Sequence, residues 1–179
     1  MTSETAPLRI NRAPVLTLWA TVVAERLGHP PETALSLASV VAGTAARAKA
    51  RRLGILDAGD HANNRASDQA RDAAPRATTP LLGRQVPLTQ DADGMVLADA
   101  CGHPAPATPV AAYVAKAFGA RLAEARAAME ALAAGMEPAE LNRVGFRLYE
   151  AFRPEVPADM RGWGAKGSFD LERVRRPAG

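Results

Sequence analysis

The chain has 179 residues, a length that favours one compact domain, or one domain with an appendage, over a multidomain protein. Alanine occurs 40 times and aromatic residues make up 4%, a composition typical of packed helices rather than of a β-sandwich or barrel. The net charge is +3, and nearly all of the 22 basic residues are arginines. The single cysteine, Cys101, excludes an internal disulfide and a multi-cysteine zinc site, which fits a reducing compartment.

A membrane-spanning segment is not expected, because no stretch approaches the roughly 20 apolar residues that a spanning helix needs. Residues 13–23 are uncharged and follow Arg9 and Arg12, as in a signal peptide. Their apolar positions recur at helical spacing, however, and they lead into Glu25 and Arg26 instead of a cleavage site. We therefore expect a cytoplasmic protein with no membrane partner.

Two helices are predicted at the N-terminus. Pro14 and Gly28 frame a helix over residues 14–27, whose apolar stripe includes Trp19 as a core residue. A second helix is predicted to run from residue 30 to residue 52. The tight turn between them predicts a helix-turn-helix-like hairpin in a basic N-terminal region, residues 1–56.

The middle of the chain changes character. Residues 57–80 contain no large apolar side chain. This composition predicts a polar linker between the hairpin and a C-terminal region, residues 81–179. That region is predicted to open with a small β-hairpin. Residues 84–90 and 95–99 form its strands, and Asp93-Gly94 is a strong turn signal.

The C-terminal region is otherwise predicted to be helical, over residues 110–118, 120–134 and a stretch that begins near Pro138. The second helix carries a seam of apolar residues that includes Leu122, Met129 and Leu132. A final short helix reaches Arg175 after a glycine-rich tail and is capped by Ser168 or Asp170. The inner stripe of the third helix is predicted to be Leu141, Val144, Leu148 and Phe152. The sequence thus predicts a mainly α fold with an N-terminal helical hairpin, C-terminal helices and a small β-hairpin.

Two segments of the sequence resemble a known group of proteins. They are RINRAPVLTLWA at residues 9–20 and GWGAKG at residues 162–167. Both resemble segments of a family of conserved, uncharacterised bacterial proteins, over about residues 9–56 and 140–175. The resemblance implies a bacterial protein but brings no established activity, cofactor or catalytic residue.

The strongest functional signal is a cluster of cations around the N-terminal hairpin. Such clusters contact the phosphates of DNA or RNA and release counterions. Cations are also favoured at any helix C-terminus, so a plain solvated surface is the alternative. The N-terminal end of the second helix, which would read bases in a recognition helix, carries Pro30, Pro31 and Glu32, so we expect phosphate contacts. The predicted nucleic-acid-binding residues are Arg9, Arg12, Arg47, Lys49, Arg51 and Arg52.

The glycine-rich tail is a second candidate site. It has the letters of the G-x-G-x-x-G fingerprint without the strand and helix that the fingerprint requires. Its backbone N–H groups and two cations could still form an anion-binding nest. The alternative is a tail that folds over the core with Trp163 as a plug. The predicted nest consists of Arg161, Gly162, Gly164, Lys166 and Gly167.

Catalytic and metal-binding patterns are missing from the sequence. His29, His61 and His103 lie far apart, and no nucleophile motif occurs. We therefore expect no cofactor and no metal, and favour a small, non-enzymatic DNA- or RNA-associated binding protein over an enzyme or ligand-binding protein that uses the loop at residues 162–167. The alternative is a helical protein–protein interaction or scaffold module, for example a homodimer, that exposes the seam of Leu122, Met129 and Leu132. A polyanionic partner would be favoured if the basic residues of the hairpin formed one continuous surface with the cations near the C-terminus. These cations are Arg161, Lys166, Arg173, Arg175 and Arg176.

Overall fold

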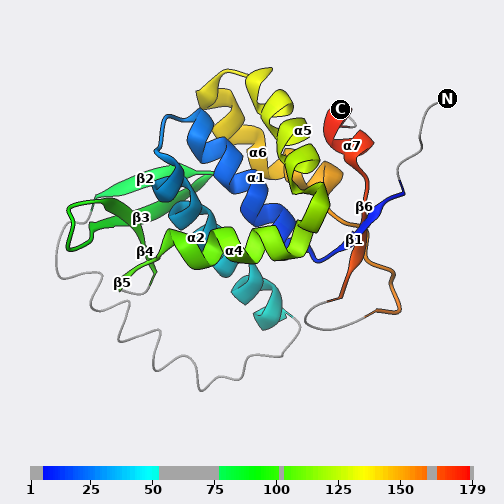
Figure 1. Ribbon diagram of the computed structural model, residues 1–179, viewed down its shortest axis with the longest axis horizontal. Helices are drawn as coiled ribbons and strands as arrows, with labels where there is room; N and C mark the ends of the chain where they lie inside the picture. The colour runs from blue at the N-terminus through cyan, green and yellow to red at the C-terminus, as the bar shows by residue number, and fades with distance from the viewer. Residues whose placement is uncertain (1–5, 53–76, 101–102, 161–164, 178–179) are drawn as a thin grey trace.

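The computed structural model describes residues 6–52, 77–100, 103–160 and 165–177 of the chain. Within these ranges the fold is mainly helical, as predicted, with two small antiparallel sheets (Figure 1). Most of the predicted linker, residues 57–76, lies outside the described residues, as does Cys101.

Helices and small sheets alternate along the described chain. The helices are α1 (Arg12–Arg26), α2 (Pro31–Arg52), α4 (Ala107–Phe118), α5 (Leu122–Ala134), α6 (Pro138–Phe152) and α7 (Leu171–Arg175), and a 3-10 turn, η1 (Gly119–Arg121), joins α4 to α5. The strands are β1 (Leu8–Ile10), β2 (Thr78–Leu81), β3 (Arg84–Gln90), β4 (Val96–Ala100), β5 (His103–Pro104) and β6 (Gly167–Phe169). One sheet has the order β2-β3-β4-β5, and the other pairs β1 with β6.

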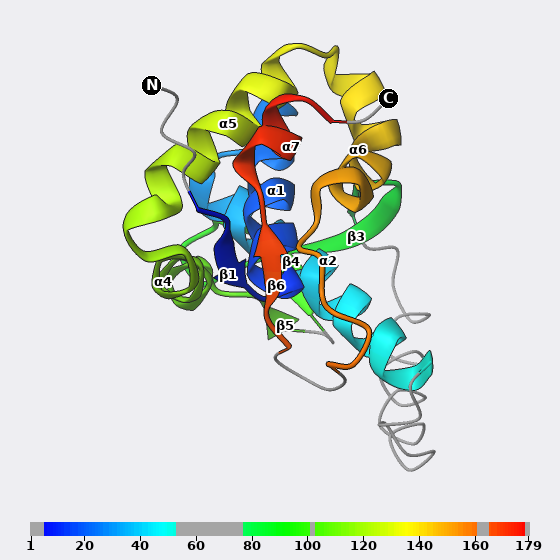
Figure 2. The same cartoon turned by 90° about the vertical axis from the view of Figure 1, so that its right-hand side faces the viewer.

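Helix α1 is the centre of the fold, with α2, α4, α5 and α6 packed around it (Figures 1 and 2). Every residue from Pro14 to Ala24 is buried, so the whole circumference of α1 is enclosed and not only the predicted stripe. The hydroxyls of Thr17 and Thr21 are satisfied within the helix, since each donates to the carbonyl four residues earlier at 2.8 Å. The prediction that Trp19 is a core residue is confirmed: its exposed fraction is 0%.

A short connection over residues 27–30 brings α2 back along α1. Gly28 adopts φ 99°, in the left-handed region that glycine occupies at little cost. Helix α1 begins at Arg12, two residues before the predicted start, because Pro14 lies in the first turn, where backbone N–H groups have no helical partner. Helix α2 extends at least to Arg52, the last described residue before the gap, so the structure agrees with the predicted helix up to this point.

The first half of α2 holds the four-stranded sheet through two hydroxyls. Thr33 Oγ1 donates to Val96 O at 2.7 Å, and Ser36 Oγ accepts from Ala98 N at 2.8 Å. The predicted strands 84–90 and 95–99 correspond to the antiparallel pair β3 and β4. Two further strands flank this pair, and residues 78–80, predicted as the end of the linker, belong to β2. The turn residues and the alternation of apolar residues predicted the central strands β3 and β4, but they did not predict the short edge strands β2 and β5.

The buried face of α6 differs from the predicted stripe. Leu141 and Phe152 are buried as predicted, but Gly145 and Tyr149 take the inner positions expected of Val144 and Leu148, which are half-buried. Gly145 faces inward because Leu82, in the turn after β2, packs against it: a Cβ at Gly145 would lie 2.5 Å from Leu82 Cδ2. Trp19 Nε1 also donates to Gly145 O at 2.8 Å.

The predicted apolar seam of α5 packs into the core of the chain. Met129 has an exposed fraction of 0%, and Leu122 and Leu132 are half-buried against the same core. The prediction that these three residues form an exposed apolar surface is therefore wrong. The seam packs on α1 and α7 instead.

The two ends of the chain meet in the β1–β6 sheet, which was not predicted (Figure 2). Arg9 lies opposite Ser168, and Ile10 lies opposite Gly167. Helix α7 follows directly and is capped by Asp170, whose carboxylate accepts from Glu172 N at 2.9 Å. Of the two predicted caps, Asp170 is therefore correct and Ser168 is a strand residue.

Candidate functional site

The last two turns of α2 extend beyond the other helices in both views (Figures 1 and 2). Arg47, Lys49, Arg51 and Arg52 are all exposed there. Residues four apart share a helix face, so Arg47 and Arg51 lie on one side and Lys49 and Arg52 on another. The four cations therefore lie on two sides of the helix end, and Ala50 on the remaining side is buried.

The other two predicted phosphate-binding residues have different environments. Arg9 is exposed on β1. Arg12 is half-buried, and its Nε donates to Pro154 O at 3.0 Å, which ties the start of α1 to the segment after α6. Burial, and secondarily the charge of Arg153, lowers the pKa of the Arg12 guanidinium. Arg9 is thus accessible to a ligand, whereas Arg12 has a structural role.

Most arginines of the C-terminal helices are paired with carboxylates, although Arg147 on α6 has no such pair among the described residues. Arg121 contacts Glu124 at 2.8 Å, and Arg126 contacts both Glu130 and Glu25. The tail arginines follow the same pattern: Arg173 pairs with Glu155, and Arg175 with Glu172 and Glu124. Two of the tail arginines that could have extended the basic surface are therefore paired locally with carboxylates.

Among the described residues, Lys49, Arg51, Arg52 and Arg9 form no such ion pair. The end of α2 carries no acidic residue after Glu32 in the same helix. Positive charge is therefore concentrated at the end of α2, whereas α6 carries two glutamates and two arginines.

The predicted anion-binding nest is described only in part. Arg161, Gly162 and Gly164 lie outside the described residues, as does Trp163. Lys166 is exposed, and Gly167 is the buried first residue of β6. A Cβ at Gly167 would lie 2.7 Å from Glu155 O, so close backbone approach accounts for this glycine.

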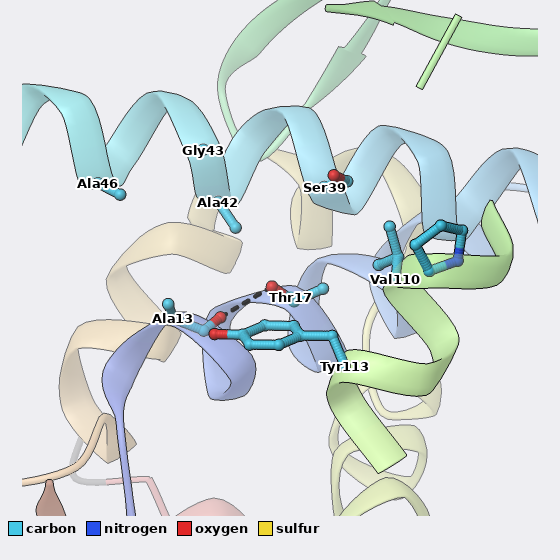
Figure 3. Close-up of a pocket in the computed structure, with 9 residues that line it drawn as sticks. Ala13, Thr17, Ser39, Ala42, Gly43, Ala46, Val110 and Tyr113 are labelled. Carbon is cyan, nitrogen blue, oxygen red and sulfur yellow. Dashed lines mark hydrogen bonds between the residues drawn. The ribbon is translucent and has the colours of Figure 1, made fainter. Parts of the chain in front are cut away.

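A pocket of about 300 Å³ lies between α1, α2 and α4 (Figure 3). Helix α1 contributes its first turns, and α2 and α4 form the two walls. The Tyr113 hydroxyl points toward Ala13, and Thr17 Oγ1 donates to Ala13 O (Figure 3). The lining residues are Ala13, Thr17, Ser39, Ala42, Gly43, Ala46, Pro109, Val110 and Tyr113.

Helix α4 leaves most of its apolar surface outside the core. Val114 and Phe118 are its buried residues, while Tyr113 is 46% exposed and the alanines beside it are exposed. Partial burial raises the pKa of the Tyr113 hydroxyl. The sequence analysis missed this site, although one signal was present: residues 107–118 contain a single charge, Lys116.

No group of three or more His, Cys, Asp or Glu within the described ranges could hold a metal ion. Burial raises the pKa of Tyr149 to about 12, and its hydroxyl donates to Arg12 O at 3.2 Å, a structural bond between α6 and α1. No helix in the described part of the chain is long and apolar enough to cross a membrane.

The candidate site thus has two parts, the basic end of α2 and the apolar pocket, and Ala46 on α2 lines the pocket just before the cations begin at Arg47. The similarity of the two segments to a bacterial family stays a prediction. Comparison with known proteins found no matching family model, no matching curated protein and no matching solved structure.

Proposed function

We propose that the protein is a nucleic-acid-associated protein, cytoplasmic and without enzymatic activity, which contacts phosphates through the basic end of α2. The observation that carries this proposal is the contrast in ion pairing. Lys49, Arg51 and Arg52 are exposed and have no carboxylate partner among the described residues, whereas the arginines of α5 and α7 have one. Exposed cations without partners can neutralise phosphates and release counterions.

Within this proposal, α1 and α2 act as a helix-turn-helix-like pair that binds the backbone and reads no bases. The cations lie in the C-terminal turns of α2, on two sides of the helix. A helix that reads bases presents its N-terminal residues to the groove. Arg9 adds a further contact, and Arg12 contributes less because its Nε is bonded to Pro154 O.

Replacing Arg51 and Arg52 together with alanine is expected to weaken binding to duplex DNA or RNA. Each phosphate contact contributes about 0.9 to the slope of log K against log salt, so the slope for B-DNA should become shallower by about 1.8. Thermal stability should be nearly unchanged, since both side chains are exposed. Fluorescence anisotropy of a labelled duplex at several salt concentrations measures the slope.

The matched control is the double replacement of Arg143 and Arg147, two exposed arginines on α6, with alanine. It removes the same charge from another face and should leave most of the affinity. Equal losses in both variants would show an effect of net charge alone. No binding at low salt by the unaltered chain would rule out the nucleic-acid proposal.

A second candidate is a helical protein–protein interaction module, and the apolar exposed face of α4 favours it. Tyr113 and the neighbouring alanines form a surface with one charge, Lys116, beside the pocket. Apolar surface that is contiguous and rimmed by polar residues is typical of interaction sites. In this candidate the interaction surface is α4 and not the α5 seam, because the α5 seam packs into the core.

Light scattering tests the homodimer form of this candidate. If two copies meet through α4, Tyr113→Asp should shift the chain from dimer to monomer, because it places a charge in an apolar interface. A monomer at all concentrations before substitution would exclude the homodimer and leave a different partner.

A further inference from the structure

Two arginines come together where the end of α6 meets the start of α1. Arg12 is the first residue of α1, and Arg153 directly follows α6. Arg12 Nε donates to Pro154 O at 3.0 Å, so its guanidinium is bonded to the residue next to Arg153. Tyr149 connects the same two places, since its hydroxyl donates to Arg12 O at 3.2 Å and its carbonyl accepts from Arg153 N at 2.7 Å. These bonds hold both arginines at one junction of the fold.

The positive charges of the two arginines act on each other and on Tyr149. Burial lowers the pKa of the Arg12 guanidinium, and the nearby charge of Arg153 lowers it further. Burial raises the pKa of Tyr149 to about 12, and the charges of Arg12 and Arg153 act against this rise. Both arginines are half-buried, so their repulsion is screened less than it would be in water.

No carboxylate of the described chain offsets this repulsion by an ion pair with either arginine. Glu155, two residues after Arg153, pairs with Arg173 instead. Glu150 is exposed, and its charge has the smallest of the effects on the pKa of Tyr149. The arginines of α5 and α7 differ, since each of them has a carboxylate partner. A bound anion would supply the missing negative charge.

Most of the hydrogen-bond donors of the two guanidinium groups are unused. Arginine has five N–H donors in a planar fork. The structural bond to Pro154 O uses only the Nε donor of Arg12, and its terminal nitrogens have no acceptor in the part of the chain that the structure describes. The Arg153 side chain likewise has no acceptor there. Because Arg12 is already held by Nε, less side-chain entropy is lost when a ligand binds its terminal nitrogens.

We propose that Arg12 and Arg153 together bind a phosphate group, either free or carried by a larger molecule. Guanidinium forks bind phosphate oxygens through pairs of parallel N–H donors. A phosphate dianion matches the two positive charges and has oxygens for both forks, whereas a carboxylate has only enough for one fork. The site is separate from the end of α2, and it does not depend on the proposed function.

Calorimetric titration of the full chain with inorganic phosphate, at constant ionic strength set with chloride, is the direct test. The chain should bind phosphate, and acetate should bind about tenfold more weakly, because it occupies one fork. Arg153→Gln should weaken phosphate binding by about tenfold or more. Arg12→Lys keeps the charge but has no fork, and it should also weaken phosphate binding.

Thermal unfolding separates ligand binding from a structural role of Arg153. Its side chain has no partner in the described chain, so Arg153→Gln without phosphate should melt at the same temperature as the unaltered chain, or higher because the repulsion of Arg12 is removed. Phosphate should raise the melting temperature of the unaltered chain but not of this variant. Arg147→Gln, at an exposed position of α6, is the control of equal charge change and should keep the response to phosphate.

Two further ligands, a nucleoside 5′-monophosphate and a DNA duplex, identify the molecule that carries the phosphate. If Arg153→Gln weakens the duplex and inorganic phosphate competes with it, the site holds a phosphate of the nucleic-acid backbone. If Arg153→Gln weakens the monophosphate and leaves the duplex unchanged, the ligand is a small phosphorylated compound. Arg51→Ala with Arg52→Ala should retain phosphate binding, so failure at the end of α2 and failure at this site are distinguishable.

Three results would overturn the proposal. The first is that none of the phosphate ligands binds to the unaltered chain. The second is an equal loss of binding in Arg153→Gln and Arg147→Gln, which would show an effect of net charge alone. The third is a lower melting temperature of Arg153→Gln in the absence of phosphate, which would show that this arginine stabilises the fold by itself.

Discussion

Replacing Trp19 with alanine is expected to lower the free energy of unfolding by about 3–5 kcal/mol, the range for truncation of a large buried aromatic residue. Trp19 is completely buried in the central helix and meets Phe152 edge-on with ring centroids 5.4 Å apart. Its Nε1 also donates to Gly145 O at 2.8 Å, a bond that the variant loses inside the core. Cavity and lost hydrogen bond act in the same direction.

Urea unfolding followed by far-ultraviolet circular dichroism measures this loss as a lower midpoint at an unchanged slope. Trp19→Phe keeps most of the ring volume and should cost less than alanine. Tyr113→Ala, which is half-exposed at the pocket, is the control and should stay within about 0.5 kcal/mol. A small loss for Trp19→Ala would contradict the central position of α1.

Replacing Gly167 with alanine is expected to destabilise the protein by about 3 kcal/mol, the upper end for overpacking of a tight site. A Cβ there would lie 2.7 Å from Glu155 O and 2.9 Å from Pro154 Cβ. The nearest atoms belong to the backbone, which also exchanges two hydrogen bonds between Glu155 and Ser168. The clash cannot be relieved by a side-chain rotation, so the β1–β6 sheet must shift.

Gly43→Ala is the matched control, because a Cβ at this helix position meets nothing within 4 Å. It should raise the free energy of unfolding by about 1 kcal/mol through helix propensity. Opposite signs for the two glycines in thermal unfolding would support the structural role of Gly167. If Gly167→Ala left the stability unchanged, the close-packing role would be contradicted, and the predicted anion-binding nest would remain as the explanation for this glycine.

Local signals were sufficient for several elements. The proline and glutamate at the start of α2 and the uninterrupted helical run to Arg52 predicted this helix correctly. Asp93-Gly94 predicted the turn between β3 and β4, and Asp170 was one of two proposed caps for α7. In each case the stabilising group lies within a few residues of the element that it specifies.

The face of α6 and the use of the α5 seam were not predictable in this way. Apolar periodicity favours Val144 and Leu148 over Gly145, yet Gly145 is buried because Leu82 and Trp19 meet it there. Met129 belongs to the core because α1 lies against α5. These partners are distant in sequence, so no local pattern identifies them. The same holds for β1 and β6, which are strands through their mutual pairing.

The candidate site likewise has features that the local sequence predicts and features that only the tertiary structure shows. The cations at the end of α2 follow from residue type and helix position, and the structure adds that three of them lack carboxylate partners in the described part of the chain. Arg12 differs, since its bond to Pro154 O was not foreseeable. The pocket was missed because its walls come from three helices, and an alanine on a helix surface gives no sign of what stands opposite.

The net charge of +3, the alanine-rich composition and the turn residues were enough to establish a mainly helical chain and to locate its basic N-terminal part. These properties depend on each residue and its near neighbours. Which arginines are neutralised, which glycines are required and where a pocket opens depend on long-range packing. That packing brings Gly145 under Trp19, Gly167 onto Glu155 and α4 beside α2, because burial of apolar surface and pairing of polar groups are settled among segments far apart in sequence.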